Sequence, residues 1–184
     1  MVDPASEQVV FENSVRGLFE RALQGRLSDA RLERLVALGV RVENGVAAAY
    51  PRDTWILMLA IAVEELAPDL SAPEAYRLLG QRLVEGVGET TLGKALVQLA
   101  RLVGPSRTLG RFNRNVRASD NFTEAEITLN GARGATLVIN DVLGLPTMYQ
   151  GVIEAMLLLA GAKEVNVVLS AEAFPTATYR ASWG

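Results

Sequence analysis

Apolar positions follow a helical period through the first two-thirds of the chain and an alternating period through the last third. The first part predicts about six helices, near residues 11–23, 28–38, 55–63, 72–87, 91–103 and 106–118. No linker rich in Gly, Pro or Ser divides the two parts. We therefore expect one α+β domain over residues 1–184, with a helical part in 1–118 and a sheet part with one helix in 124–184.

Local signals mark several of the predicted helices. Gly25 follows the first helical pattern, at the position where a left-handed glycine commonly ends a helix. Ser71 and Glu74 form the pattern of a capping box at the start of another helix. The segment from Trp55 to Val63 is apolar on every side, which predicts a helix at the centre of the fold.

The last third predicts a sheet interrupted by one helix. Alternating residues 124–129 and 135–140 flank a turn at 130–134, which is typical of a hairpin. A helix is expected over about 147–160, followed by a second hairpin formed by 164–169 and 177–183. The order ββαββ predicts a four-stranded antiparallel sheet with one face covered by helices.

Composition excludes many function classes. The chain contains no His and no Cys, so it cannot form a thiolate nucleophile, a Ser–His pair, an iron–sulfur cluster or an ordinary zinc site. A net charge of −3 and 49% hydrophobic content are typical of a globular protein and do not favour a nucleic-acid partner. The sequence also lacks the nucleotide-binding glycine motifs. We expect no enzyme activity, no catalytic residues, no metal site and no cofactor.

The chain shows no sign of a membrane span or a secretory signal. Its longest unbroken apolar run, Trp55 to Val63, has nine residues, against the ~18–20 that a spanning helix needs. The N-terminus, MVDPASEQVV, has neither a basic region nor an apolar core. A cytoplasmic location is the expectation that follows.

An arginine pattern is the first candidate site. Within SRTLGRFNRNVR the arginines recur at steps of four, three and three, which would place them along one stripe of a continuous helix. Such a stripe predicts an anion-binding site for a carboxylate or phosphate, formed by Arg107, Arg111, Arg114 and Arg117. The alternative is that these arginines pair with carboxylates elsewhere or lie in solvent.

The second candidate site is apolar. Several large side chains lie on predicted helices or helix starts that could converge between the helices and the sheet. They predict a ligand-binding site lined by Trp55, Tyr76, Phe112, Met148 and Tyr149. The alternative is that the same residues form an ordinary packed core.

Longer stretches of the sequence resemble a known family. These are APDLSAPEAYRLLGQRLVEG, TTLGKAL, LVGPSRTLGRFNRNVRASDNFTE, the late Tyr149-Gln150-Gly151, and the pair Tyr179 and Trp183 near the end. Together they are similar to a paralogous myxobacterial family of domains of unknown function. The resemblance covers nearly the whole chain and implies no activity.

A more distant resemblance concerns topology. Helices followed by ββαββ are similar to the superfamily that joins haem–nitric oxide sensor domains, 4-vinyl reductase-like domains and Bet3-type trafficking subunits. In the haem sensors a helical His ligates the iron, and this chain has none. The other members imply a pocket for an apolar molecule between helices and sheet.

Two functions stay open at this point. The first is a non-enzymatic sensory or ligand-binding module that feeds a signalling pathway and holds an apolar or amphipathic small molecule. In that case Arg111 or Arg114 is expected to meet an acidic head group of the ligand. The second is a protein–protein adaptor or a homodimerisation module, whose surface binds a signalling protein without a small-molecule ligand.

Overall fold

The computed structural model describes residues 7–42 and 45–184. The helices are α1 (Glu12–Val15), which continues as the π-helix η2 (Arg16–Ala22), α2 (Asp29–Ala37), α3 (Arg52–Leu66), α4 (Ala72–Glu89), α5 (Thr91–Val103), α6 (Pro105–Leu109), α7 (Phe112–Val116) and α8 (Pro146–Leu159). The strands are β1 (Val9–Phe11), β2 (Ala49–Pro51), β3 (Ala125–Leu129), β4 (Gly134–Ile139), β5 (Asn166–Ala173) and β6 (Thr176–Ser182).

The last third folds as the predicted four-stranded antiparallel sheet, with strand order β3-β4-β6-β5 and α8 between its two hairpins in the chain. Alternate residues face inwards: Leu137 pairs with Tyr179, and both are fully buried. The first strand of the second hairpin is longer than predicted. It extends to Ala173, and it contains a bulge after Leu169.

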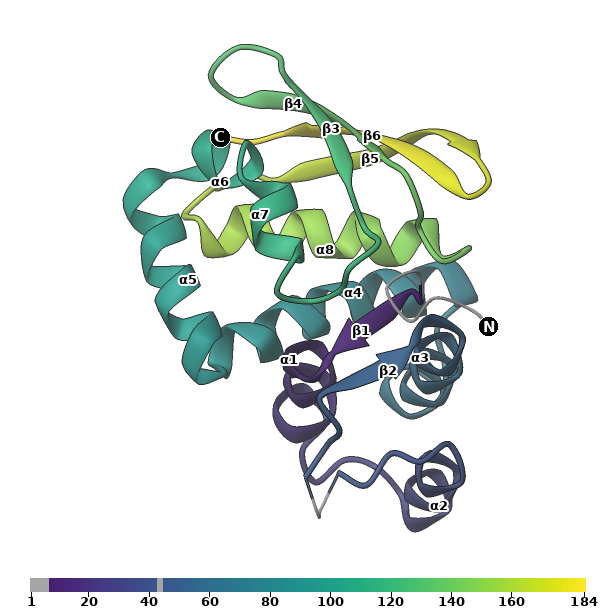
Figure 1. The fold of residues 1–184 in the computed structure, drawn as a ribbon. Coiled ribbons are helices and arrows are strands. Elements are labelled where there is room, and N and C mark those ends of the chain that lie inside the picture. The colour runs from purple at the N-terminus through teal and green to yellow at the C-terminus, as the bar shows by residue number, and fades with distance from the viewer. Residues whose placement is uncertain (1–6, 43–44) are drawn as a thin grey trace.

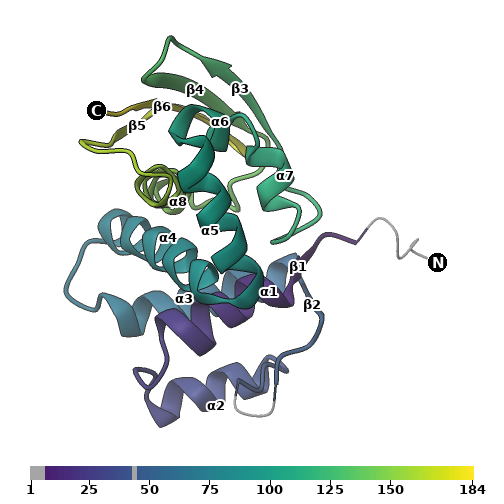
Figure 2. The ribbon, with the colours of Figure 1, turned by 90° about the vertical axis from the view of Figure 1, so that its left-hand side faces the viewer.

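The elements stack in layers that can be followed in Figures 1 and 2. The sheet lies on α8, α8 lies on α4, and α1, η2 and α3 lie beyond α4, with α2 outermost. The middle of the stack is therefore formed by α8 and α4, each of which has neighbours on both sides. The expectation that the segment from Trp55 to Val63 is central is wrong: α3 has an open side on which Leu57 is 53% exposed.

Glycines bring the stacked helices into backbone contact. A Cβ atom at Gly80 of α4 would lie 2.0 Å from the carbonyl oxygen of Met148, and one at Gly151 of α8 would lie 1.9 Å from that of Arg77. On the other side of α4, a Cβ at Gly86 would lie 2.0 Å from the carbonyl oxygen of Gly17. Because no side chain fits between these backbones, α4 is held closely against both α8 and η2.

Capping residues stand at both ends of α4. The predicted capping box of α4 is present, with the backbone N–H of Ser71 donating to Oε2 of Glu74 over 3.2 Å. Thr90 caps α5 by accepting a hydrogen bond from the N–H of Gly93 over 3.0 Å.

None of the helices in the described part of the chain is long and apolar enough to cross a membrane.

The predicted helix over 106–118 is interrupted. It forms two short helices, α6 and α7, and Arg111 between them has φ −107° and ψ 13°, outside the helical range. Asn113 then joins α7 to β3: its Nδ2 donates to the carbonyl oxygen of Ala125, and its Oδ1 accepts from the N–H of the same residue. These two hydrogen bonds hold α7 beside the start of β3.

Candidate ligand-binding cavity

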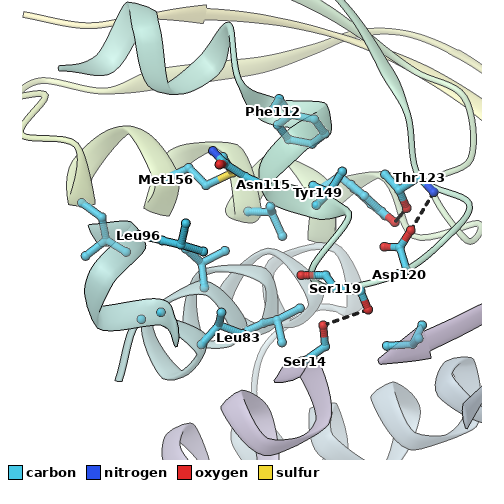
Figure 3. Close-up of a pocket in the computed structure, with 18 of the residues that line it drawn as sticks. Ser14, Leu83, Leu96, Phe112, Asn115, Ser119, Asp120, Thr123, Tyr149 and Met156 are labelled. Carbon is cyan, nitrogen blue, oxygen red and sulfur yellow. Dashed lines mark hydrogen bonds between the residues drawn. The ribbon is translucent and has the colours of Figure 1, made fainter. Parts of the chain in front are cut away.

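A cavity of about 160 Å³ lies among α4, α5, α7 and α8 and the loop that follows α7 (Figure 3). Most of its lining is apolar. The residues are Val10, Ser14, Trp55, Leu83, Val84, Val87, Gly88, Gly93, Leu96, Val97, Ala100, Thr108, Phe112, Asn115, Val116, Ser119, Asp120, Phe122, Thr123, Leu143, Met148, Tyr149, Val152, Met156 and Leu159. The cavity thus lies between helices from the N-terminal part and the helix that supports the sheet.

The structure brings together four of the five residues of the predicted apolar site. Trp55, Phe112, Met148 and Tyr149 all line the cavity. Tyr76 is not in the lining. It is half-buried on the part of α4 that faces α3. Burial raises the pKa of its hydroxyl, and the negative charge of Glu64 on α3 raises it further. The sequence could place Tyr76 on an apolar helix face but could not tell which neighbour that face meets.

One side of the cavity is formed by α5, which packs loosely. Only Gly93 of this helix is buried, while Leu96, Val97 and Ala100 are half-buried and face the cavity. A Cβ at Gly93 would lie 1.7 Å from the carbonyl oxygen of Val87, so the start of α5 is held tightly against the end of α4. Beyond that point, side chains rather than backbone separate α5 from the rest of the molecule.

The loop after α7 contributes several polar residues to the lining. Oδ1 of Asp120 accepts hydrogen bonds from the N–H groups of Phe122 and Thr123, over 3.1 and 2.7 Å, which forms an Asx turn. The hydroxyls of Thr123 and Tyr149 lie 3.3 Å apart and share a hydrogen bond. Ser14 donates to the carbonyl oxygen of Ser119 over 3.3 Å. Figure 3 shows these groups together at one end of the cavity.

Burial changes the titration of the two ionisable groups in the lining. Removal from water raises the pKa of the Asp120 carboxyl, although its two backbone hydrogen bonds oppose this shift. Burial also raises the pKa of Tyr149 well above its ordinary value, and the nearby Asp120 charge adds to this effect. The Tyr149 hydroxyl therefore stays neutral at physiological pH, which leaves Asp120 as the one carboxyl group in the lining over the residues described.

The arginine stripe does not form, and its members lie outside the cavity. All four predicted residues, Arg107, Arg111, Arg114 and Arg117, are exposed, and none is in the lining. The break at Arg111 ends the continuous helix on which the stripe depended. Arg117 pairs with Glu124 over 3.6 Å, and both side chains are largely exposed. The expectation that Arg111 or Arg114 meets the head group of a ligand in this cavity is not supported by their placement.

Two residues of the site were not predicted as such. Asp120 and Thr123 lie in the loop after α7, between the helix and the strand that the sequence predicts. Their position depends on β1, since Phe11 donates to the carbonyl oxygen of Ser119 over 2.8 Å, and Val10 forms an isolated bridge with Asp120. A contact between segments more than a hundred residues apart leaves no local signal in the sequence.

Sequence comparison assigns the chain to a group without assigning a function. Residues 8–184 match a family model described as "Protein of unknown function (DUF2378)". This confirms the predicted resemblance to a family of domains of unknown function. No curated protein sequence matches the chain.

Solved H-NOX structures have a similar fold. An unliganded Fe(II) H-NOX variant from K. algicida is 9% identical, with a TM-score of 0.65 over 95% of this chain and 96% of its own. The S. oneidensis H-NOX protein in the Fe(II)NO ligation state is 9% identical, with a TM-score of 0.64 over 94% and 99%. A third structure, described by the modulation of haem redox potential through porphyrin distortion, is 11% identical, with a TM-score of 0.60 over 94% and 98%. Such likeness shows the fold alone, so the chain has an H-NOX-like fold.

The residues of the cavity do not fit a haem group. The chain has no His or Cys to ligate iron, and the Tyr149 hydroxyl is already bonded to Thr123. Among the residues that the structure describes, no Arg or Lys lines the cavity to neutralise the haem propionates, and the one charged group, Asp120, has their sign. A cavity of about 160 Å³ also suits a benzene-sized molecule, since an apolar cavity of ~150 Å³ holds benzene.

Proposed function

This chain belongs to the DUF2378 family of proteins of unknown function and has an H-NOX-like fold, and from that premise we propose that it is a sensory or ligand-binding module. It holds a small apolar or amphipathic molecule in the cavity between α4, α5 and α8, and it binds this molecule without transforming it. The observation that carries the proposal is the cavity itself, which is apolar over most of its lining and has a few polar groups gathered at one end.

Filling the cavity from α5 is expected to abolish binding of an apolar probe. Ala100 lines the cavity, so an Ala100→Phe side chain would occupy the space that toluene needs. Ala95 is exposed on the same helix, which makes Ala95→Phe the matched control. We expect toluene to bind the unmodified protein and the Ala95→Phe variant, and affinity to fall at least tenfold in Ala100→Phe. Isothermal calorimetry measures all three.

The exposed arginines supply a second control for the same experiment. The double variant Arg111→Ala/Arg114→Ala should bind toluene as the unmodified protein does and keep its melting temperature within a few degrees, because both side chains are exposed outside the cavity. Absence of toluene binding to the unmodified protein, or equal loss in Ala95→Phe and Ala100→Phe, would contradict the proposed function.

A second function is favoured by the outer face of α5. Three leucines spaced seven and three residues apart lie on one face of this helix and are exposed by 50%, 44% and 83%: Leu92, Leu99 and Leu102. Exposed apolar stripes of this kind are typical of interaction surfaces. The second candidate is therefore a homodimer or an adaptor for a signalling protein. Sedimentation velocity tests the dimer: a dimeric protein should become monomeric in Leu99→Ser/Leu102→Ser, and a monomeric unmodified protein would exclude self-association.

A further inference from the structure

The cavity is polarised along its length. Figure 3 shows Leu96 at one end and Asp120, Thr123 and Tyr149 at the other. The first end is formed mainly by aliphatic side chains from α4, α5 and α8, with Asn115 of α7 beside Met156, and the second by the loop after α7 together with the start of α8. A molecule with one apolar end and one polar end would therefore lie in a defined direction. What the polar end of that molecule must be depends on the charges around Asp120.

Among the residues that the structure describes, no cation in the cavity pairs with Asp120. Its described donors are all neutral: the backbone N–H groups of Phe122 and Thr123, which bond Oδ1, and the side chain of Thr123. The guanidinium of Arg52 is engaged by Asp141, with Nε to Oδ2 at 3.1 Å and Nη2 to Oδ1 at 3.0 Å. A carboxylate removed from water without a cation is costly, and a ligand that brings a positive charge would compensate for that cost.

A ligand with an acid group would have the opposite effect. Its carboxylate would approach Asp120 in a cavity whose lining, over the residues described, contains no cation. Like charges in a poorly solvated site repel strongly, so a fatty acid or an aromatic acid is disfavoured there. A neutral molecule would be accepted but would leave the Asp120 carboxylate without a counter-charge.

We infer that the ligand of this cavity is a small amphipathic amine, with an apolar body of about the size of benzene directed towards Leu96 and a protonated amino group that pairs with Asp120. The inference rests on the proposed function, because it assumes that the cavity holds a ligand. It replaces the acidic head group expected from the arginine pattern with a basic one.

Four probes that share one ring and differ in the attached group test this inference: benzylamine, benzyl alcohol, toluene and benzoate. Calorimetry on the full chain at neutral pH should give benzylamine the highest affinity, about tenfold above toluene, with benzoate weakest. In Asp120→Asn the advantage of benzylamine over toluene should be lost. The amide oxygen of Asn can still accept from Phe122 and Thr123, so the turn is retained; circular dichroism and the melting temperature check the fold.

The dependence on pH gives a second measurement that needs no variant. Protonation of Asp120 removes its charge, so the advantage of benzylamine over toluene should shrink as the pH falls. Because burial raises the pKa of Asp120, this loss should begin at a higher pH than for an exposed aspartate. Of the other groups that face Asp120, Asp141 is paired with Arg52, and the hydroxyl of Tyr149 is neutral throughout this range.

Each outcome has one meaning. Toluene bound as tightly as benzylamine, or benzoate bound more tightly than either, would overturn the inference and leave the proposed function standing. An amine preference that persists in a folded Asp120→Asn variant would also overturn it, because the carboxylate would then not be the partner. If none of the four probes binds, toluene included, the proposed function itself fails.

Discussion

Replacing Gly151 with Ala is expected to destabilise the protein by about 3 kcal/mol or more, which for a chain of this length lowers the melting temperature by roughly 6–12 °C. The new methyl group would lie 1.9 Å from the carbonyl oxygen of Arg77, and the atoms next to it in that direction are backbone. A flexible side chain could move aside, but a helix backbone can move only if α4 and α8 separate. That movement would also disturb the cavity, since both helices line it.

Two further variants, a second test and a control, are compared with Gly151→Ala by thermal melting and urea unfolding. Gly80→Ala should cost a similar amount, because its Cβ would meet the Met148 carbonyl from the opposite side of the same crossing. Gly110→Ala is the control: the nearest atom lies 3.5 Å from its Cβ and its φ of −58° suits any residue, so its melting temperature should stay within about 2 °C. Equal stability of Gly151→Ala and the unmodified protein would show that the two helices are not held in backbone contact.

The glycine crossing illustrates what local sequence could and could not predict. The extent of α8, its place between two hairpins and the capping box of α4 follow from side-chain period and from residues within one turn, and they are confirmed. The partner of α8 depends on contacts between residues about seventy positions apart, such as Gly80 and Met148. For this reason the sequence favoured α3 as the central helix, although α4 and α8 occupy the middle of the stack.

The candidate site shows the same division between local and distant information. Trp55, Phe112, Met148 and Tyr149 were predicted to converge because they lie on apolar helix faces, and the structure brings them to one cavity. The arginine stripe relied on an uninterrupted helix, and one non-helical residue at Arg111 was enough to break it. The convergence of the apolar set tolerates small errors in helix ends, whereas a stripe defined by angular spacing does not.

The cluster around Glu154 carries the second large prediction. Glu154 of α8 is 4% exposed, and it accepts hydrogen bonds from Nε and Nη2 of Arg77 and, over 2.8 Å, from Nε2 of Gln81. Arg77 and Gln81 both belong to α4, so this ion pair joins the same two helices as the glycines. The hydrogen bond to Glu154 also raises the pKa of Arg77, which keeps its positive charge in place.

Arg77→Met should therefore destabilise the protein by about 2–3 kcal/mol, because it leaves a buried carboxylate whose remaining partner is a neutral amide. The loss stays below the range for fully buried pairs because Arg77 is 46% exposed, and water can partly replace it. Adding Glu154→Gln to Arg77→Met should restore at least half of the loss, since the double variant has no buried charge at position 154 and still offers an acceptor to Gln81. Urea unfolding of the three variants forms a double-mutant cycle.

Arg82→Met is the matched control for this cycle, because it removes an arginine from the same helix. Arg82 pairs with Glu85 over 2.7 Å, but both side chains are more than 40% exposed, so the loss should stay below about 0.5 kcal/mol. If Arg77→Met and Arg82→Met had equal effects, the burial of Glu154 would not matter to stability. If instead only Arg77→Met is costly and Glu154→Gln relieves it, the contact between α4 and α8 depends on a neutralised charge as well as on close glycine packing.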